Sequence, residues 1–396
     1  MTDIRSVGVL GAGTMGAGIA QVAAEAGLDV LLHDPVAGAT ERATARIGGF
    51  LDRKVEKAQL AVADAEGAKA RIGMAPSMDA LAAADVVIEA IPEDLELKRE
   101  TFAALDAAAE SDVILATNTS SLSVAQIAAA TTRPERVAGM HFFNPVPLMG
   151  LVEVIAGPAT DPSVTDALAA LATRLGKTPV VAADTPGFIV NRIQRALYLE
   201  AFRIFEAGEA SIREIDEAMR AAGFRLGPFE LADVVGTDVN LAAGQAIHEG
   251  FKRHPRFRPV DVQRRVVEAG RLGRKTSAGY YDYGPDGARG APWSKLGSPA
   301  ASMAGDVIQR RVLAVIVNEA ASALEDGIAD PDAIDTAMKL ASNWPEGPLA
   351  WGDRIGLGSV VATLDELAAA QTDGRYDITP LLRQRAVSVS GVVDLE

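Results

Sequence analysis

The chain has 396 residues, 48% of them hydrophobic and 23% charged, so it can build a sizeable core and is long enough for two or three domains. It contains no cysteine, which excludes disulfides, thiolate catalysis and cysteine-ligated zinc, and fits a cytoplasmic protein. No metal site is predicted. The formal net charge of −15 argues against nucleic acid or an anionic membrane as a partner, so a local basic cluster must capture any anionic substrate. No apolar run is long enough to span a bilayer, and the first residues leave no room for a signal peptide.

A glycine-rich turn follows the first apolar run of the chain. Residues 7–10 are predicted to form a buried strand, and an alanine-rich helix pattern begins in the motif Gly11-x-Gly13-x-x-Gly16. In dinucleotide-binding folds these glycines permit the tight turn, the approach of the pyrophosphate and close helix–strand packing, while the helix N-terminus faces the phosphates. Asp34 ends the next predicted strand, 28–33, where a carboxylate accepts from both adenosine ribose hydroxyls and repels a 2′-phosphate. The motif therefore predicts an NAD site.

Apolar strands and helical patterns alternate through the first 183 residues, which predicts a mostly parallel, doubly wound sheet of the Rossmann type. The further predicted strands are 84–91, 113–116, 137–143, 151–155 and 178–183. The predicted helices between them are 38–68, 97–109, one from 124, and 161–175.

From residue 184 onward helical patterns dominate. Residues 189–208 are predicted to form a long helix that stops at a glycine, and Ser211 is the expected cap of a shorter helix over 211–222. Residues 275–299 are rich in glycine and proline and are interpreted as loop and linker.

The remainder of the chain repeats this helical segment. Residues 191–220 match 310–339 at an offset of 119, and a one-residue insertion extends the match further. The matched positions are Glu200 with Glu319, Gly208 with Gly327, Asp216 with Asp335, Ala218-Met219 with Ala337-Met338, Gly227-Pro228 with Gly347-Pro348, Asp233 with Asp353 and Gly236 with Gly356. The predicted fold is thus a Rossmann-type α/β domain, 1–183, followed by two all-α domains, 184–296 and its duplicate 297–396. We expect the two copies to pack as an internal pseudo-dimer, in a chain that is either a monomer or a homodimer.

Polar residues stand at the ends of the predicted strands. Asn118 and Ser120 lie in a loop after a buried strand, where a simple helix-cap turn is an equally good interpretation. His141 ends an apolar strand, and Glu153 interrupts another; a buried acid must be paired or carry a raised pKa. A carboxylate beside a histidine selects the imidazole tautomer and lets the ring act as a base, although a lone histidine at a strand end is more often structural. Asn191 opens the first long helix and has a capping role as its alternative.

Taken in series, the motifs resemble L-3-hydroxyacyl-CoA dehydrogenases. The resemblance covers about residues 1–285, and the repeat extends it to the C-terminus. It is carried by Gly11–Gly16, Asn118-Thr-Ser-Ser121, Gly139-Met-His-Phe-Phe-Asn-Pro145, Leu151-Val-Glu-Val154, Asp184-Thr-Pro-Gly-Phe-Ile-Val-Asn-Arg192 and the run 271–282.

The resemblance implies reversible, NAD-dependent oxidation of a (3S)-3-hydroxyacyl-CoA to the 3-ketoacyl-CoA, as in fatty-acid β-oxidation or a related acyl-CoA degradation. It implies that His141 is the general base, that Glu153 orients its imidazole, and that Ser120 and Asn191 hydrogen-bond the reacting oxygen. The implied cofactor-binding residues are Gly11, Gly13, Thr14, Met15, Gly16, Asp34, Glu93, Lys98, Asn118, Ser120 and Asn144.

The CoA phosphates are expected at a basic run on a helical segment. The resemblance matches Lys57 best, with Lys54 and Arg53 beside it, and a solvated helix face is the alternative interpretation. Gly150 departs from the family pattern, because some relatives carry a lysine there.

Two other functions fit the same layout. The first is an NAD-dependent dehydrogenase of a small hydroxy acid without CoA, which the basic run disfavours. The second is an NAD-binding scaffold without redox activity, which the complete set Ser120, His141, Glu153 and Asn191 disfavours.

Overall fold

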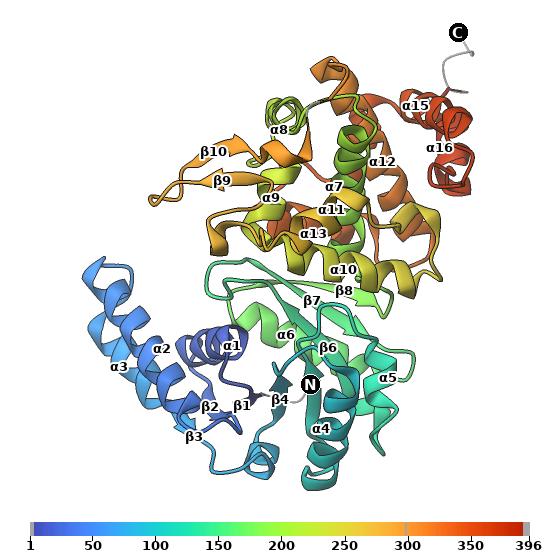
Figure 1. The fold of residues 1–396 in the computed structure, drawn as a ribbon. Helices are drawn as coiled ribbons and strands as arrows, with labels where there is room; N and C mark the ends of the chain where they lie inside the picture. Colours follow the sequence, from blue (N-terminus) through green and yellow to red (C-terminus); the bar gives the residue numbers. More distant parts are fainter. Residues whose placement is uncertain (1–3, 298, 391–396) are drawn as a thin grey trace. The chain divides into compact units, whose positions relative to one another are not determined.

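The structure is a computed structural model that describes residues 4–297 and 299–390. The chain divides into two compact units, Met1–Phe188 and Ile189–Glu396 (Figure 1). Each unit is described below by itself.

The first unit is built on one eight-stranded sheet. Its strand order is β3-β2-β1-β4-β5-β6-β7-β8, and every neighbouring pair is parallel except β6 and β7. The strands are β1 Ser6–Leu10, β2 Asp29–His33, β3 Ile72–Met74, β4 Val86–Glu89, β5 Ile114–Thr117, β6 Val137–Phe142, β7 Leu151–Ala156 and β8 Thr178–Ala183. The strand order reverses between β1 and β4, which places a crevice at their carboxyl ends, where dinucleotides bind in such folds.

Six α-helices connect the strands of this unit. They are α1 Thr14–Glu25, α2 Ala39–Glu56, α3 Val62–Ala70, α4 Leu95–Ala108, α5 Val124–Ala128 and α6 Pro162–Arg174. The single helical stretch predicted over 38–68 is therefore wrong: the chain turns after α2, where Ala58 takes a φ of +54°. The edge strand β3 was not predicted, because its three residues Ile72-Gly73-Met74 are too short and too exposed to show a pattern.

One large buried cluster of the core lies on one face of the sheet. Alternate strand residues such as Val7, Val9 and Val86 form one buried cluster with apolar residues of α1, α2, α3 and α6. Alternation places successive residues on opposite faces, so Gly8 faces the other side of the sheet, where Leu81 and Val87 lie close to it. A sheet covered on both faces needs nearly continuous apolar strands, which explains why β4, β5 and β6 are buried throughout.

The second unit is mostly helical. Its α-helices are α7 Val190–Glu206, α8 Ile212–Ala221, α9 Pro228–Val235, α10 Thr237–Gly250, α11 Asp261–Glu268, α12 Gly305–Glu325, α13 Pro331–Ser342, α14 Pro348–Ile355, α15 Leu357–Ala370 and α16 Pro380–Ser390. Ser211 caps α8 as predicted, in a reciprocal capping box with Glu214. None of the helices in the described parts of the chain combines the length and apolarity that a membrane span requires.

A β-hairpin replaces part of the linker predicted over 275–299. Strands β9, Tyr281–Tyr283, and β10, Arg289–Pro292, pair antiparallel. Tyr281 and Tyr283 are buried while Asp282 between them is exposed, a period-two pattern that the surrounding glycines and prolines obscured.

The repeat seen in the sequence appears as a repeated series of helices. The order α7, α8, α9, α10 recurs as α12, α13, α14, α15, and α12 packs against α7 and α8 (Figure 1). Gly208 and Gly327, which follow the two long helices, share a left-handed conformation with φ of +70° and +68°.

Candidate active site

The glycine-rich turn between β1 and α1 has the geometry of a phosphate cradle. Gly11 has a φ of +101°, and a Cβ added there would lie 2.6 Å from the Ala90 carbonyl oxygen. At Gly16 a Cβ would lie 1.8 Å from the Gly11 carbonyl oxygen, so neither position accepts a side chain. A Cβ on Gly13 would meet no atom within 4 Å, and no side chain caps the first turn of α1. Open space beside uncapped helix N–H groups fits a dinucleotide pyrophosphate.

Asp34 connects the end of β2 to this cradle. One carboxylate oxygen accepts from the Ala12 amide at 2.7 Å and the other from the Val36 amide at 2.9 Å. These bonds hold the carboxylate beside the glycine-rich turn. Each oxygen keeps acceptor capacity, since an ionised carboxylate offers about four lone-pair sites.

A buried ion pair lies at the end of β4. Lys98 on α4 donates to Glu89 at 2.6 Å, and the two side chains are 1% and 0% exposed. Thr117 and the Ile91 amide also donate to Glu89, each at 2.7 Å. Lys98 thus stabilises the end of β4 from inside the protein. Glu89 was not singled out from the sequence, although an acid in an apolar strand is the same signal that identified Glu153.

Glu93 organises the loop that carries Ser120. It accepts from the Thr119 hydroxyl at 2.7 Å, from the Ser120 amide at 2.9 Å and from the Ser121 amide at 3.1 Å. Burial alone would raise its pKa, but the Lys98 charge and these hydrogen bonds outweigh burial and hold the pKa below its usual value. Glu93 therefore stays ionised and holds the Ser120 backbone in place.

His141 and Glu153 form a buried pair on adjacent strands. They are directly opposite in the antiparallel register of β6 and β7, and His141 Nδ1 lies 2.6 Å from Glu153 Oε2. His141 is 5% exposed and Glu153 0%. The Phe143 ring packs on the imidazole at a centroid distance of 4.4 Å. Only the reversal of chain direction between these strands brings together two residues twelve positions apart.

Asn118 braces the strand that carries His141. Its side-chain oxygen accepts from the Phe142 amide at 2.8 Å, and its own amide donates to the Glu89 carbonyl at 2.8 Å. Asn118 therefore fixes the backbone next to His141, a role in addition to the cofactor contact that the resemblance implies.

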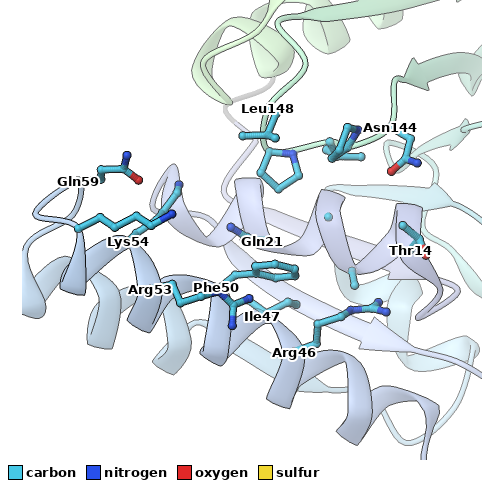
Figure 2. A pocket seen from close by; sticks show the side chains of 16 residues that line it. Thr14, Gln21, Arg46, Ile47, Phe50, Arg53, Lys54, Gln59, Asn144 and Leu148 are labelled. Carbon is cyan, nitrogen blue, oxygen red and sulfur yellow. The ribbon is translucent and has the colours of Figure 1, made fainter. Parts of the chain in front are cut away.

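A cavity of about 450 Å³ lies between α1, α2 and the loop 144–148 (Figure 2). Arg53, Lys54, Lys57 and Asn144 line it, so the predicted basic run faces a cavity. Lys54 is paired with Glu25 at 2.5 Å, which leaves Arg53 and Lys57 as the freer charges of the run.

Lys177 supports the loop over this cavity, a residue not identified from the sequence. Its ammonium donates to the carbonyls of Val146 and Met149 at 2.6 and 2.8 Å. Burial lowers its pKa. Gly150 lies next to this loop, and its carbonyl accepts from the Thr178 amide at 2.7 Å.

The first unit thus brings together His141, Glu153 and Asn118, and it links Ser120 through Glu93 to the ends of β4 and β5. Asn191 belongs to the second unit, where it is the second residue of α7 and half-buried.

A Rossmann sheet with a glycine-rich turn and an acid after β2 defines a dinucleotide-binding protein. The family described as 3-hydroxyacyl-CoA dehydrogenase, NAD binding domain, matches residues 6–185. The family described as 3-hydroxyacyl-CoA dehydrogenase, C-terminal domain, matches residues 187–283 and 308–388. The chain belongs to the 3-hydroxyacyl-CoA dehydrogenase family of NAD-dependent oxidoreductases, as the sequence motifs predicted.

Similar proteins support this assignment over the full length. A 3-hydroxyadipyl-CoA dehydrogenase of Escherichia coli K12 is 37% identical, and the match covers 99% of both chains. A 3-hydroxybutyryl-CoA dehydrogenase of Bradyrhizobium diazoefficiens is 45% identical over 71% of this chain and 96% of its own. The crystal structure of an Escherichia coli K12 3-hydroxybutyryl-CoA dehydrogenase has a TM-score of 0.92 at 37% identity, covering 98% of this chain and 100% of that one.

Proposed function

We propose that the protein oxidises (3S)-3-hydroxyacyl-CoA to 3-ketoacyl-CoA reversibly, with His141 as general base, in an acyl-CoA degradation pathway. The observation that carries this proposal is the buried His141–Glu153 pair in the same unit as a dinucleotide cradle, in a chain of this family. Short and dicarboxylic acyl groups are the first substrates to test, because similar proteins are named for 3-hydroxybutyryl-CoA and 3-hydroxyadipyl-CoA. The absence of cysteine supports a cytoplasmic location.

The base function follows from the tautomer that Glu153 selects. An ionised carboxylate only accepts hydrogen bonds, so the atom 2.6 Å from it, His141 Nδ1, carries the proton. The other ring nitrogen then has a lone pair that takes the proton of the substrate 3-hydroxyl. Glu153 offsets the positive charge that develops on the imidazole. NAD, when bound, supplies the acceptor for the hydride that leaves C3.

The remaining proposed roles concern binding. Ser120 and Asn191 donate to the reacting oxygen, and the cradle Gly11–Gly16 with Asp34 holds the dinucleotide. Asn144 lines the site, and Arg53 and Lys57 bind phosphate groups of CoA in the α1–α2 cavity. An apolar cavity with cations among its lining residues suits a nucleotide with several phosphates.

The test is His141→Gln, which should lower kcat by a factor of about 10²–10⁴, the usual range for a lost general base. The binding of NADH, followed by fluorescence, should stay near that of the wild type. Glu153→Gln should lose most of the same rate, and the double variant should add little because the two residues act as a unit. Wild-type turnover by His141→Gln would refute the assignment.

Cofactor choice tests the role of Asp34. Its charge should exclude a 2′-phosphate, so the wild type should prefer NAD, and Asp34→Ala should narrow the ratio of kcat/KM between NAD and NADP. The Ala12 and Val36 amides lose their acceptor in this variant, so a thermal unfolding curve is the necessary control. Equal use of both cofactors by the wild type would contradict the prediction.

We also propose the domain division 1–183, 184–296 and 297–396, in which the two helical segments form an internal pseudo-dimer with one active site per chain. The repeated helix order supports this division.

A further inference from the structure

The cavity between α1 and α2 has a cation at each end and an apolar middle. Figure 2 shows Arg46 beside Thr14 at one end and Arg53 with Lys54 toward the other, with Ile47 and Phe50 between them. Arg46, Phe50 and Arg53 follow one another at intervals of four and three residues along one face of α2, and Lys57 follows four residues later at the C-cap of the helix. At about 1.5 Å of rise per residue, Arg46 and Arg53 are attached about 10 Å apart.

At the Thr14 end of the cavity, Arg46 has a neutral hydrogen-bond partner. Its guanidinium donates to the Gly13 carbonyl at 2.9 Å, and the residue is exposed. A phosphate would offer this guanidinium a stronger, charge-assisted hydrogen bond than a carbonyl does. The side chain is therefore already directed to the Thr14 end of the cavity, where an anion would meet it.

We infer that Arg46 is a further substrate-binding residue that binds the diphosphate of CoA, while Arg53 and Lys57 bind its 3′-phosphate. This inference rests on the proposed acyl-CoA substrate. CoA carries these two anionic groups on either side of a ribose, with an adenine that stacks on aromatic rings. Phe50 is 45% exposed, and the Arg53 guanidinium lies 4.5 Å from the centroid of its ring. The ring thus lies in the apolar middle of the cavity, with the Arg53 guanidinium over it.

The direction of the Gly13 carbonyl distinguishes the binding of CoA by Arg46 from a contact of Arg46 with the dinucleotide. That carbonyl also accepts from the Ala17 amide at 3.0 Å, so it points along α1 toward the C-terminus of the helix. The N–H groups that receive the dinucleotide phosphates point the opposite way, as they do at every helix N-terminus. Arg46 therefore approaches α1 from the side of the CoA cavity.

The experiment compares Arg46→Gln with Arg42→Gln. Arg42 lies one turn earlier on α2, is also exposed and donates to the Ala37 carbonyl, but is not among the residues that line the cavity. KM is measured with NADH and three substrates: acetoacetyl-CoA, acetoacetyl-dephospho-CoA and acetoacetyl-pantetheine. Arg46→Gln should raise KM about tenfold for the two substrates that carry the diphosphate and leave acetoacetyl-pantetheine unchanged. The double variant Arg53→Gln/Lys57→Gln should raise KM for acetoacetyl-CoA alone.

The other outcomes have defined meanings. If Arg46→Gln behaves like Arg42→Gln with every substrate, the inference is wrong. A rise in the KM for NADH that persists with acetoacetyl-pantetheine would overturn it in favour of a dinucleotide contact. Arg46→Lys keeps the charge and should recover part of the lost affinity; no recovery, with an unchanged melting temperature, would also count against phosphate binding. Absence of wild-type turnover with any acyl-CoA would instead refute the proposed function, which separates the two failures.

Discussion

The two halves of the helical unit show which residues a duplicated segment keeps and which it changes. Across the two long helices the ion pairs are reciprocal: Arg192 donates to Glu319 and Arg311 donates to Glu200, each at 2.5 Å. Arg192 and Arg311 are themselves 119 positions apart, as are the two glutamates. In a two-fold dimer residue i contacts j and j contacts i, and this chain shows that pattern within itself.

An aspartate that is buried in the first half and half-buried in the second is kept in both. Asp216 accepts from the Phe229 and Glu230 amides at the start of α9. Asp335 does the same for the Leu349 and Ala350 amides at the start of α14. A Cβ on the preceding glycines, Gly227 and Gly347, would lie 2.3 and 2.1 Å from these aspartates, which explains why both glycines persist.

The second aspartate of each half has diverged. Asp233 is 1% exposed, and it accepts from the Tyr280 and Tyr281 amides and from the Tyr283 hydroxyl of the β9 hairpin. Asp353, at the matching position, is exposed. The reciprocal ion pairs constrain both copies, whereas the hairpin constrains only the first.

Among the tests of the two helical halves, deletion of residues 297–396 should have the largest effect on the protein. It removes α12, which covers α7 and α8, and so exposes apolar surface that the first copy cannot cover alone. We expect aggregation or a new homodimer, measured by light scattering after size exclusion. A monomer of unchanged stability and full activity would refute the internal pseudo-dimer.

Removal of one partner of a reciprocal ion pair should have the second-largest effect. Glu319→Ala removes the buried partner of Arg192, which keeps the half-exposed Asp326 at 2.8 Å, and should lower the free energy of unfolding by about 3 kcal/mol, the low end of the range for a broken buried pair, measured by urea denaturation. Glu200→Ala should have a similar effect, because Arg311 is left in the equivalent position. Glu249→Ala, which removes an exposed pair with Arg253, is the control and should change little. If Glu319→Ala lowers the free energy of unfolding no more than Glu249→Ala does, the reciprocal arrangement is contradicted.

The smallest expected effect is on the pH dependence of stability. Burial raises the pKa of Asp216 to about 7 and that of Asp233 to about 6, from 3.8. Between pH 4 and 7 the folded state then binds more protons than the unfolded state, so this contribution is full below about pH 4 and is lost as the pH rises through 7.

Asp233→Asn should therefore reduce the fall in stability between about pH 4 and 6, measured by the urea midpoint at each pH. Asp353→Asn changes the exposed carboxylate at the matching position and is the control. An unchanged pH slope in Asp233→Asn would show that burial does not keep the Asp233 carboxyl protonated.

Local patterns predicted those parts of the fold in which a residue's neighbours along the chain decide its conformation. Strand β8 begins and ends where the apolar run predicted, and Ser211 caps α8 as expected. The two outer glycines of the Gly11–Gly16 motif are required by contacts within the turn and its neighbouring strand. The hairpin at Tyr281–Tyr283 was missed because its stability comes from Asp233, forty-eight residues before Tyr281 in the chain.

In the candidate site, too, the sequence identified single residues and the tertiary structure determined their partners. Glu153 was found because an acid in an apolar strand must have a partner, and His141 was the available base. Only the antiparallel register of β6 and β7 places these two residues opposite each other. In the parallel pair β4 and β5, Glu89 lies opposite Thr117 and accepts its hydrogen bond, and α4 supplies Lys98 as a further partner. Which residues are costly to bury follows from the amino-acid sequence, since that cost depends on the side chain. The tertiary structure alone decided which partner offsets the cost, because the partner comes from a different strand or helix.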